Sequence, residues 1–450
     1  MGEAIYNLIS YMPDASGFDL PYSEIRDLQL QALNERLEER IDKIKLVKLR
    51  ADEAEISRIN RLEDIVPLLL PHTAYKSYPE SFLIEKRWDR LTKWLGTVST
   101  HPIDNVDLDG VTDIDDWIQR LANAGHFVSC SSGTTGKSAM LNASQADIDF
   151  AAQDGVAAVQ WGSDIRVGDK RAMVGYGATA YTPRNQAMGK ALMEAFADTS
   201  IQRADYKVPP ITIGSITKMI ELRKSIADGT AKPAEIAEYE AETKTRQEAF
   251  DRAIIIAAED MIAKRDHRLY ISGMWATLHH IASAVRERGY SGKDFHPENC
   301  IYLGGGLKRA QLPADFKEFT FETFNLQPRF IFQMYGMQEL GTSMVRCQQG
   351  LRYHIPPWLV CLPLNKNGDA LVDGVGEGEV EGRAAFFDLA MDGRWGGVIS
   401  GDHIHVDYSP CACGNKSPSI RDDIVRYADL EGDDKIGCAG TVDAYVRGLS

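Results

Sequence analysis

The sequence predicts an α/β fold followed by a smaller β-rich part, and two patterns carry this prediction. From Leu269 onward, short apolar runs at residues 269–271, 301–303 and 330–332 alternate with helical stretches such as 274–288. Alternating strands and helices are typical of a sheet with crossover connections. The last quarter has more glycine and shorter apolar runs, which indicates a β subdomain. The 450 residues suffice for two or three subdomains.

The N-terminal part is expected to be helical. Residues 27–62 are predicted to form one long helix, because Leu30, Leu33 and Leu37 recur at three- and four-residue steps among charged side chains. This apolar stripe could pack on the chain's own core or against a partner helix. A homodimer therefore remains an open expectation.

A second helical region is expected in the middle of the chain. Residues 216–228 and 234–264 read as a helical pair, with Gly229 as a stop signal and Pro233 as a first-turn residue. The many charges on the second helix indicate a solvated face rather than an acidic site. We interpret the pair as an insertion on the core.

The composition excludes several classes of partner. A formal charge of −15 argues against a broad nucleic-acid surface and against anionic membranes. No apolar run approaches the roughly 20 residues that span a bilayer, and the N-terminal residues do not resemble a secretion signal. We therefore expect a cytoplasmic protein without a membrane or nucleic-acid partner. Seven cysteines in this length do not suggest a disulfide scaffold.

Residues 130–140 are the stretch with the clearest chemistry. They contain many hydroxyls, two glycines and Lys137, and they follow an apolar run at 126–128. Backbone amides, hydroxyls and an ammonium can surround a polyphosphate. A helix at 113–124 is expected to lead into this loop, and a helix at 143–159 is expected to follow with its start facing the phosphates. A solvated polar loop is the plain alternative.

The P-loop of nucleotide triphosphatases is the nearest generic motif. It needs a glycine five positions before Gly136, with four residues between them, but Ser131 stands there. A side chain at that position hinders close approach of the backbone to phosphate. The sequence therefore disfavours a P-loop.

The cysteines supply a second signal. Cys411 and Cys413 form a tight pair in a turn, and Cys347 lies seven residues before His354. Three thiolates and one imidazole can complete a tetrahedral zinc site. The remaining cysteines are expected to be buried or incidental, although Cys130 beside the loop is a candidate reactive thiol; these are Cys130, Cys300, Cys361 and Cys438.

Residues 131–137, Ser-Ser-Gly-Thr-Thr-Gly-Lys, closely resemble the phosphate loop of the adenylate-forming enzymes, which include acyl-CoA synthetases, peptide-synthetase adenylation domains and luciferases. The resemblance implies that this loop holds the β- and γ-phosphates of ATP. The implied phosphate-binding residues are Ser131, Ser132, Gly133, Thr134, Thr135, Gly136 and Lys137.

Residues 335–339, Tyr-Gly-Met-Gln-Glu, resemble the Tyr-Gly-x-Thr-Glu motif of the same family. The resemblance implies that Tyr335 stacks on adenine beside Gly336 and that Glu339 holds the Mg²⁺ that bridges phosphate oxygens. Gln338 stands where threonine is usual, and its amide would donate a hydrogen bond to the α-phosphate.

Two further motifs flank this one in the family's order. Gly304 and Gly305 follow an apolar run, and the resemblance implies that they lie beside the adenine and the acyl group. Ser400-Gly401-Asp402 resembles Thr-Gly-Asp, whose aspartate accepts hydrogen bonds from the ribose. Residues 440–448 resemble the hinge before the mobile C-terminal domain, with Thr441 in place of an arginine. The chain ends at Ser450, so that domain is expected to be absent.

The positions of these cysteines and of His354 resemble those in the phenylacetate–CoA ligase branch of the family. Its members carry a cysteine and a histidine after the Tyr-Gly-x-Thr-Glu motif and a Cys-x-Cys-Gly before the hinge, which implies a structural Zn²⁺ here. The predicted parts are a helical region over 1–125, an adenylate-forming core over 126–345 with the insertion at about 216–264, a β-rich subdomain with the zinc knuckle over 346–440, and a hinge stub over 441–450.

The reaction implied by the resemblance is attack of a carboxylic acid on MgATP, which gives an acyl-adenylate (acyl-AMP) and pyrophosphate. The acyl group would then pass to coenzyme A, to a carrier-protein or protein thiol, or to an amine. Tyr176, Tyr181 and Trp275 are candidate walls of the acid pocket and mildly favour an aryl or bulky apolar acid. The alternative is a degenerate protein that binds nucleotide or acyl-adenylate without turnover, which Gln338 and Thr441 favour.

Overall fold

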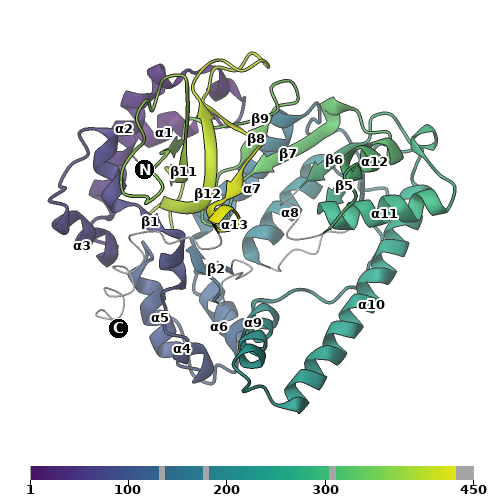
Figure 1. Cartoon of the computed structure of the whole chain (residues 1–450), viewed down its shortest axis with the longest axis horizontal. Coiled ribbons are helices and arrows are strands. Elements are labelled where there is room, and N and C mark those ends of the chain that lie inside the picture. The colour runs from purple at the N-terminus through teal and green to yellow at the C-terminus, as the bar shows by residue number, and fades with distance from the viewer. Residues whose placement is uncertain (1, 131–136, 176–181, 304–310, 432–450) are drawn as a thin grey trace. The chain divides into compact units, whose positions relative to one another are not determined.

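A computed structural model describes residues 2–130, 137–175, 182–303, 311–431 of the chain (Figure 1). These residues divide into two compact units. Unit 1 comprises Met1–Ala157 and Gly336–Ser450, and unit 2 comprises Ala158–Tyr335. The chain passes from unit 1 to unit 2 within the helix α7 (Gln145–Gly162) and returns after the strand β7 (Ile331–Tyr335). Unit 2 is thus inserted between two parts of unit 1.

Unit 2 is built on parallel strands in the order β7-β6-β5-β4. The other strands are β4 (Ala172–Val174), β5 (Leu269–Gly273) and β6 (Cys300–Leu303). The helical elements of unit 2 are α8 (Pro183–Phe196), α9 (Ile213–Ala227), α10 (Pro233–Ala263), α11 (Trp275–Glu287), η4 (Gly292–Asp294), α12 (Phe316–Thr323) and η5 (Pro328–Phe330). Strands joined by helices confirm the predicted α/β class.

The two faces of this sheet carry different side chains, because successive residues of a strand point to opposite faces. Ile271, Ile301 and Ile331 belong to one buried cluster with the apolar residues of α10 and α11. On alternate positions, Tyr270 stacks on Tyr302, and Tyr302 stacks on Phe332 with ring centres 5.0 Å apart. The apolar runs at 269–271 and 301–303 are therefore strands buried on both faces.

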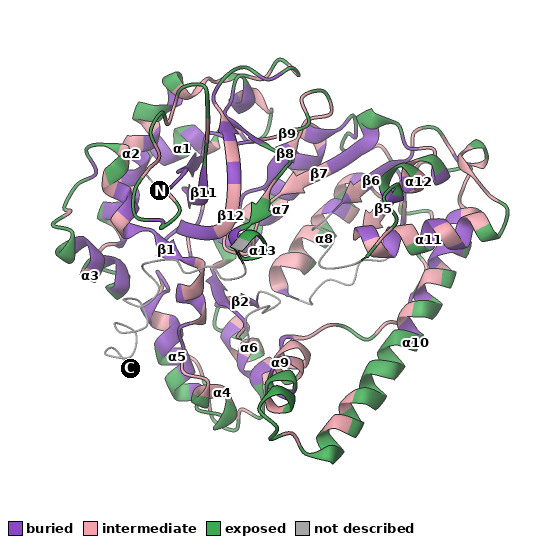
Figure 2. Cartoon of the chain, viewed as in Figure 1, coloured by how far each residue is buried: buried purple, intermediate pink, exposed green. Residues whose placement is uncertain are grey.

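The predicted helical pair is confirmed as α9 and α10, and its interpretation as an insertion on the core stays a prediction. Gly229 adopts a positive φ of 70° after α9, and Pro233 is the first residue of α10. Figure 2 shows that the N-terminal half of α10 is mostly exposed, whereas its C-terminal half buries Ala253, Ala257 and Met261. The charges of this helix lie on a solvated face, as predicted.

Unit 1 contains antiparallel strands in the order β10-β11-β12-β13-β9-β8, with β1 and β14 also paired to β12. This arrangement confirms the predicted β-rich last quarter. The strands are β1 (Leu70–Pro71), β8 (Met344–Arg346), β9 (Arg352–His354), β10 (Leu359–Cys361), β11 (Glu379–Asp388), β12 (Gly397–Asp407), β13 (Ser419–Arg421) and β14 (Val425–Arg426).

The N-terminal helices of unit 1 correct one prediction. Residues 27–62 do not form one helix, because the chain turns after Arg40 and Ile44 takes up an extended conformation with its side chain fully buried. The helical elements of unit 1 other than α7 are α1 (Glu3–Ile9), η1 (Ser16–Asp19), α2 (Tyr22–Arg40), α3 (Lys45–Glu53), η2 (Leu62–Leu68), η3 (His72–Lys76), α4 (Ser81–Ile84), α5 (Trp88–Thr97), α6 (Ile114–Asn123) and α13 (Tyr427–Glu431). Leu33 and Leu37 of α2 are buried in the chain itself, which favours the first of the two packing alternatives.

The segments on either side of the predicted phosphate loop contain the two expected helices and one additional strand. A helix at 113–124 is confirmed as α6, and the helix at 143–159 as α7, but a strand separates the loop from α7. The strands β2 (Phe127–Cys130) and β3 (Met140–Ala143) form an antiparallel pair in which Cys130 faces Met140 and Phe127 faces Ala143. The strand β3 therefore stands between Lys137 and α7 in the chain, and a start of α7 that faces the phosphates stays a prediction.

The predicted domain boundaries at 125/126, 345/346 and 440/441 stay predictions, and the two units divide the chain at other positions. Among the described residues, no helix is both long and apolar enough to cross a bilayer.

Candidate functional site

Residues 131–136 of the predicted phosphate loop lie outside the described residues. Lys137 is described and is half-buried. Its Nζ donates a hydrogen bond of 2.7 Å to the carbonyl of Tyr78 and lies 5.2 Å from the centre of the Tyr78 ring. The Tyr78 hydroxyl donates to the carbonyl of Ser138. Lys137 and Ser138, which follow the loop, are thus hydrogen-bonded to the segment 72–78.

The same segment interacts electrostatically with the predicted metal ligand Glu339. Burial lowers the pKa of the Lys76 ammonium, the Glu339 carboxylate opposes this shift, and the Arg426 guanidinium adds to it. Burial raises the pKa of Tyr75, and the Glu339 carboxylate raises it further. Tyr75 and Lys76 of η3 thus interact electrostatically with Glu339, and Tyr78, two residues after η3, binds Lys137.

The guanidinium of Arg394 contacts this region from another side. It is 3 % exposed, lies 5.8 Å from the ring centre of Tyr75, and donates 3.1 Å to the carbonyl of Glu339. A longer contact of 3.5 Å reaches the carbonyl of Gln338. The side chain of Gln338 is half-buried, and its predicted role toward the α-phosphate remains a prediction.

Asp402, the predicted ribose ligand, lies in β12 opposite Arg426 of β14. Its Oδ1 is 3.6 Å from Nε of Arg426, and its side chain is 16 % exposed. Arg426 also acts on Lys76 electrostatically, as described above. Unit 1 therefore gathers the carboxylates of Glu339 and Asp402 with the cations of Lys76 and Arg426.

The remaining predicted nucleotide residues are not gathered in unit 1. Tyr335 is the last residue of β7 in unit 2 and Gly336 is the first residue of the returning chain. Gly304 and Gly305 lie outside the described residues, as do Tyr176 and Tyr181 of the expected acid pocket.

Trp275 corrects the prediction of a pocket wall. Its indole is 6 % exposed, and its ring centre lies 5.0 Å from that of Phe316 and 5.7 Å from that of Phe321. The side chain is part of the hydrophobic cluster of unit 2. The Trp275 side chain therefore belongs to the hydrophobic core of unit 2.

The predicted zinc ligands come together in unit 1. Cys347, His354, Cys411 and Cys413 offer ligand atoms that all lie within 4.8 Å of one another. We call these four residues the Cys/His cluster. Sγ of Cys347 is 3.7 Å from Sγ of Cys411, and Sγ of Cys413 is 3.3 Å from Nε2 of His354. Residues 64 positions apart therefore meet because β13 pairs with β9.

The surroundings of the Cys/His cluster suit a metal. Nδ1 of His354 is 3.1 Å from the Ser417 hydroxyl, which leaves Nε2 directed toward Cys413. Burial raises the pKa of the Cys347 thiol, but hydrogen bonds from His354 and from backbone amides outweigh burial and lower it below its usual value. Gly350 lies so close that a Cβ there would be 2.2 Å from Sγ of Cys411. Three sulfurs and one imidazole nitrogen fit a closed tetrahedral site.

The other described cysteines are buried, as expected; these are Cys130, Cys300 and Cys361. Burial raises the pKa of the Cys130 thiol far above its ordinary value, and its Sγ lies 3.4 Å from the Met140 sulfur. A thiol in this setting is not ionised near neutral pH, so the prediction of a reactive Cys130 is wrong. Cys438 lies outside the described residues.

Lys76 and Arg394 are functional candidates that the sequence analysis missed. Neither belongs to a recognised motif, and each stands far along the chain from the residues it contacts. The only sequence signal is the position of Arg394 eight residues before Asp402, which by itself has no specificity.

The chain has the fold of the adenylate-forming carboxylate ligases. It is similar to 2-hydroxyisobutyryl-CoA ligase in complex with 2-HIB-AMP and CoA in the thioesterification state, with a TM-score of 0.57, 14 % identity, and coverage of 92 % of this chain and 70 % of that one. For the postadenylation state of the same ligase with R3-HIB-AMP, the TM-score is 0.55, the identity 12 %, and the coverage 93 % and 73 %. No protein-family model and no curated protein matches the sequence.

Proposed function

We propose that the protein activates a carboxylic acid with ATP, forming an acyl-adenylate and releasing pyrophosphate. One observation carries the proposal: the segment 72–78 binds Lys137 through the carbonyl of Tyr78, while Arg394 lies 5.8 Å from the ring centre of Tyr75 and donates to the carbonyl of Glu339. A cation that follows a Ser/Thr/Gly-rich loop is thus placed in one unit with a carboxylate suited to Mg²⁺. The shared fold with a ligase captured with an acyl-adenylate supports the proposal.

Both reactants are anions, so the protein's contribution is charge neutralisation and in-line positioning. Lys137, with the hydroxyls and amides of 131–136, would bind the β- and γ-phosphates. Glu339 would hold Mg²⁺, which when bound neutralises charge on the phosphate oxygens. Asp402 would accept hydrogen bonds from the ribose. Tyr335 would stack on the adenine, with Gly304, Gly305 and Gly336 beside the ligand and Gln338 donating to the α-phosphate.

The acceptor of the second step is proposed to be coenzyme A. Support comes from the complex of 2-hydroxyisobutyryl-CoA ligase with CoA, because that structure has the same fold. A carrier-protein thiol or an amine is the alternative acceptor. The substrate is proposed to be a small-molecule carboxylic acid.

A structural Zn²⁺ in the Cys/His cluster is the second part of the proposal. All four tetrahedral positions would be filled by protein atoms, so the metal would stabilise the fold of unit 1 and take no part in the reaction. Metal analysis should find about one equivalent of zinc per chain. A protein purified without chelator that contains no metal would contradict this assignment.

The test of the activity is carboxylate-dependent exchange between ATP and labelled pyrophosphate. The panel comprises aryl, arylacetic, medium-chain and 2-hydroxy acids, with Mg²⁺ and a control without acid. Exchange with any acid would support adenylation. Measurable ATP binding without exchange would favour the degenerate binding protein, and acid-independent release of orthophosphate would favour a phosphatase.

A further inference from the structure

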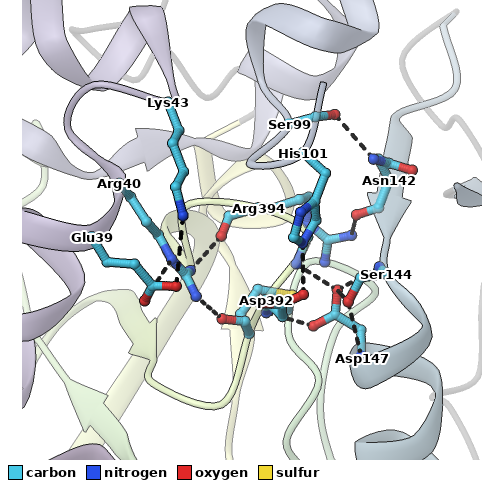
Figure 3. Close-up of polar contacts among 12 residues, drawn as sticks. Glu39, Arg40, Lys43, Ser99, His101, Asn142, Ser144, Asp147, Asp392 and Arg394 are labelled. Carbon is cyan, nitrogen blue, oxygen red and sulfur yellow. Dashed lines mark hydrogen bonds and ion pairs between the residues drawn. The ribbon is translucent and has the colours of Figure 1, made fainter. Parts of the chain in front are cut away.

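The connection between β11 and β12, residues 389–396, is held by buried arginines of α2. Arg36 donates through Nε to the carbonyl of Leu389 at 3.0 Å, and Arg40 donates to the carbonyls of Met391 and Arg394 at 2.5 and 2.6 Å. Arg40 is fully buried, and burial lowers its pKa to about 10, so it remains charged at neutral pH. Figure 3 shows Arg40 directed at this connection from the side of α2.

A carboxylate from α7 holds the same connection at two amides. Asp147 accepts hydrogen bonds from the amides of Asp392 and Gly393 at 2.6 and 2.7 Å (Figure 3). A Cβ at Gly393 would lie 2.7 Å from Oδ2 of Asp147 and 2.8 Å from the amide nitrogen of Ser144. The backbone of residues 391–394 is therefore fixed by ionised side chains from α2 and α7.

This fixed connection presents the side chain of Arg394 to two predicted parts of the site. Its guanidinium donates 2.7 Å to the carbonyl of Asn142 and 3.1 Å to the carbonyl of Glu339. Asn142 lies in β3, the strand that follows Lys137, and its carbonyl contact with Arg394 is drawn in Figure 3. One buried cation thus joins the strand after the predicted phosphate loop to the predicted metal ligand.

Carboxylates hold the amides that follow Glu339. Asp388 accepts from the amides of Gly341 and Thr342 at 2.8 and 3.0 Å, and Asp154 accepts from the amide of Ser343 at 3.0 Å. We call residues 338–343 the Glu339 segment. Its first carbonyls are bonded to a cation and its last amides to anions, which leaves its backbone little freedom to shift.

We propose that Arg394 is a positioning residue that sets the Glu339 carboxylate for the metal of MgATP. The inference rests on the proposed function. Arg394 would touch neither the metal nor the phosphates and would act through the backbone of Glu339. Groups that orient a metal ligand typically change metal affinity by about 10–100-fold when removed.

The test compares the affinity for MgATP with that for ATP in EDTA, by calorimetry on the purified chain. The ratio of the two affinities isolates the metal. We expect Arg394→Met to lower this ratio about 10-fold, Arg394→Lys to lower it less because one carbonyl contact survives, and Glu339→Gln to abolish the difference. Arg36→Met is the matched control, because Arg36 fastens the same connection without contacting Asn142 or the Glu339 segment.

If Arg394 has only a structural role, Arg394→Met should lower the melting temperature, as is expected for Arg36→Met, and leave the ratio of the two affinities unchanged. That outcome would overturn this inference but not the proposed function. If Arg394→Met does not fold, an unchanged ratio in Arg394→Lys overturns it. A wild-type chain that binds ATP without any dependence on Mg²⁺, or binds no ATP, overturns the proposed function and the inference with it.

Discussion

The Cys/His cluster and the Glu339 segment are both predicted metal sites in unit 1, but they are held in place in different ways. In the cluster, the sequence motif supplies the ligand atoms, and His354 needs only Ser417 to orient it. In the Glu339 segment, the motif supplies one carboxylate, while Arg394, Asp388 and Asp154 hold its backbone. The sequence motif thus supplies all four ligands of the soft-metal site. The single carboxylate offered to a hard metal depends instead on buried charged residues that lie far away in the chain.

The largest expected effect would come from breaking the Cys/His cluster. Cys413→Ser should lose the zinc and destabilise unit 1 by more than about 3 kcal/mol, because folding and metal binding are coupled. Metal analysis and urea denaturation would measure the two losses. The control is Ala412→Ser, which changes the residue between the two cysteines. Retention of one equivalent of zinc by Cys413→Ser would remove this residue from the site.

A second comparison uses the predicted ATP-binding residues. Lys137→Ala and Glu339→Gln should each slow pyrophosphate exchange by about 10²–10³-fold, on the order of 3–4 kcal/mol, because each removes charge stabilisation that is aimed at the phosphates. Lys48→Ala and Glu63→Gln, at exposed positions of unit 1, should leave exchange unchanged. Full activity in either test variant would exclude that residue from the mechanism.

The hydrogen bond between Nδ1 of His354 and the Ser417 hydroxyl tests how far the cluster depends on its surroundings. Ser417→Ala should weaken zinc binding by about 10–100-fold, or roughly 1.4–2.8 kcal/mol, since the imidazole loses the group that orients it. Competition with a chelating dye would measure the change. Ser409→Ala, in the turn before the cysteine pair, is a suitable control. An unchanged zinc affinity in Ser417→Ala would mean that the four ligands alone define the site.

The smallest expected effect concerns two aspartates. Asp392 lies in the connection that carries Arg394, and Asp388 directly precedes this connection. Burial raises the pKa of Asp388, whereas for Asp392 burial is outweighed by hydrogen bonds from Ser144 and His101, which lower its pKa. Asp392 therefore stabilises the fold above its unfolded pKa of about 3.9 and loses this contribution as the pH falls through its folded value. Asp388 acts in the opposite sense, losing stability as the pH rises from about 3.9 to its folded value.

The two asparagine variants should reveal these opposite slopes. Compared with Asp392→Asn, the wild type should gain on the order of 1 kcal/mol or less in free energy of unfolding as the pH rises from the folded pKa of Asp392 to about 3.9. Relative to Asp388→Asn, it should lose stability as the pH rises above about 3.9. Urea denaturation between pH 3 and 7 would measure both differences, and equal slopes would contradict the assignment.

Much of the fold could be predicted because local patterns determine it. Gly229 and Pro233 mark the insertion, and the runs at 269–271 and 301–303 form strands at the predicted places. The single helix over 27–62 was wrong because its apolar spacing continues through the turn before Ile44. A pattern of buried positions does not reveal where the backbone turns.

The candidate site could be predicted only where side-chain chemistry is specific. The Cys/His cluster follows from thiols and an imidazole, whereas Arg394 and Lys76 look like ordinary surface cations in the sequence. Their roles arise from burial and from contacts with residues far away in the chain. The strand β3 between Lys137 and α7 was not predicted either, because its four residues form a strand only by pairing with β2.

The insertion of unit 2 into unit 1 has a consequence for synthesis on the ribosome. Arg36 finds its carbonyl partner, Leu389, only 353 residues later. At about 5–20 residues per second, the nascent N-terminal helices would wait roughly 20–70 s for the strands they pack against. During that time Leu33 and Leu37 would be exposed, while unit 2, which is continuous in the chain, could already fold. Co-translational maturation is therefore expected to begin in the middle of the chain.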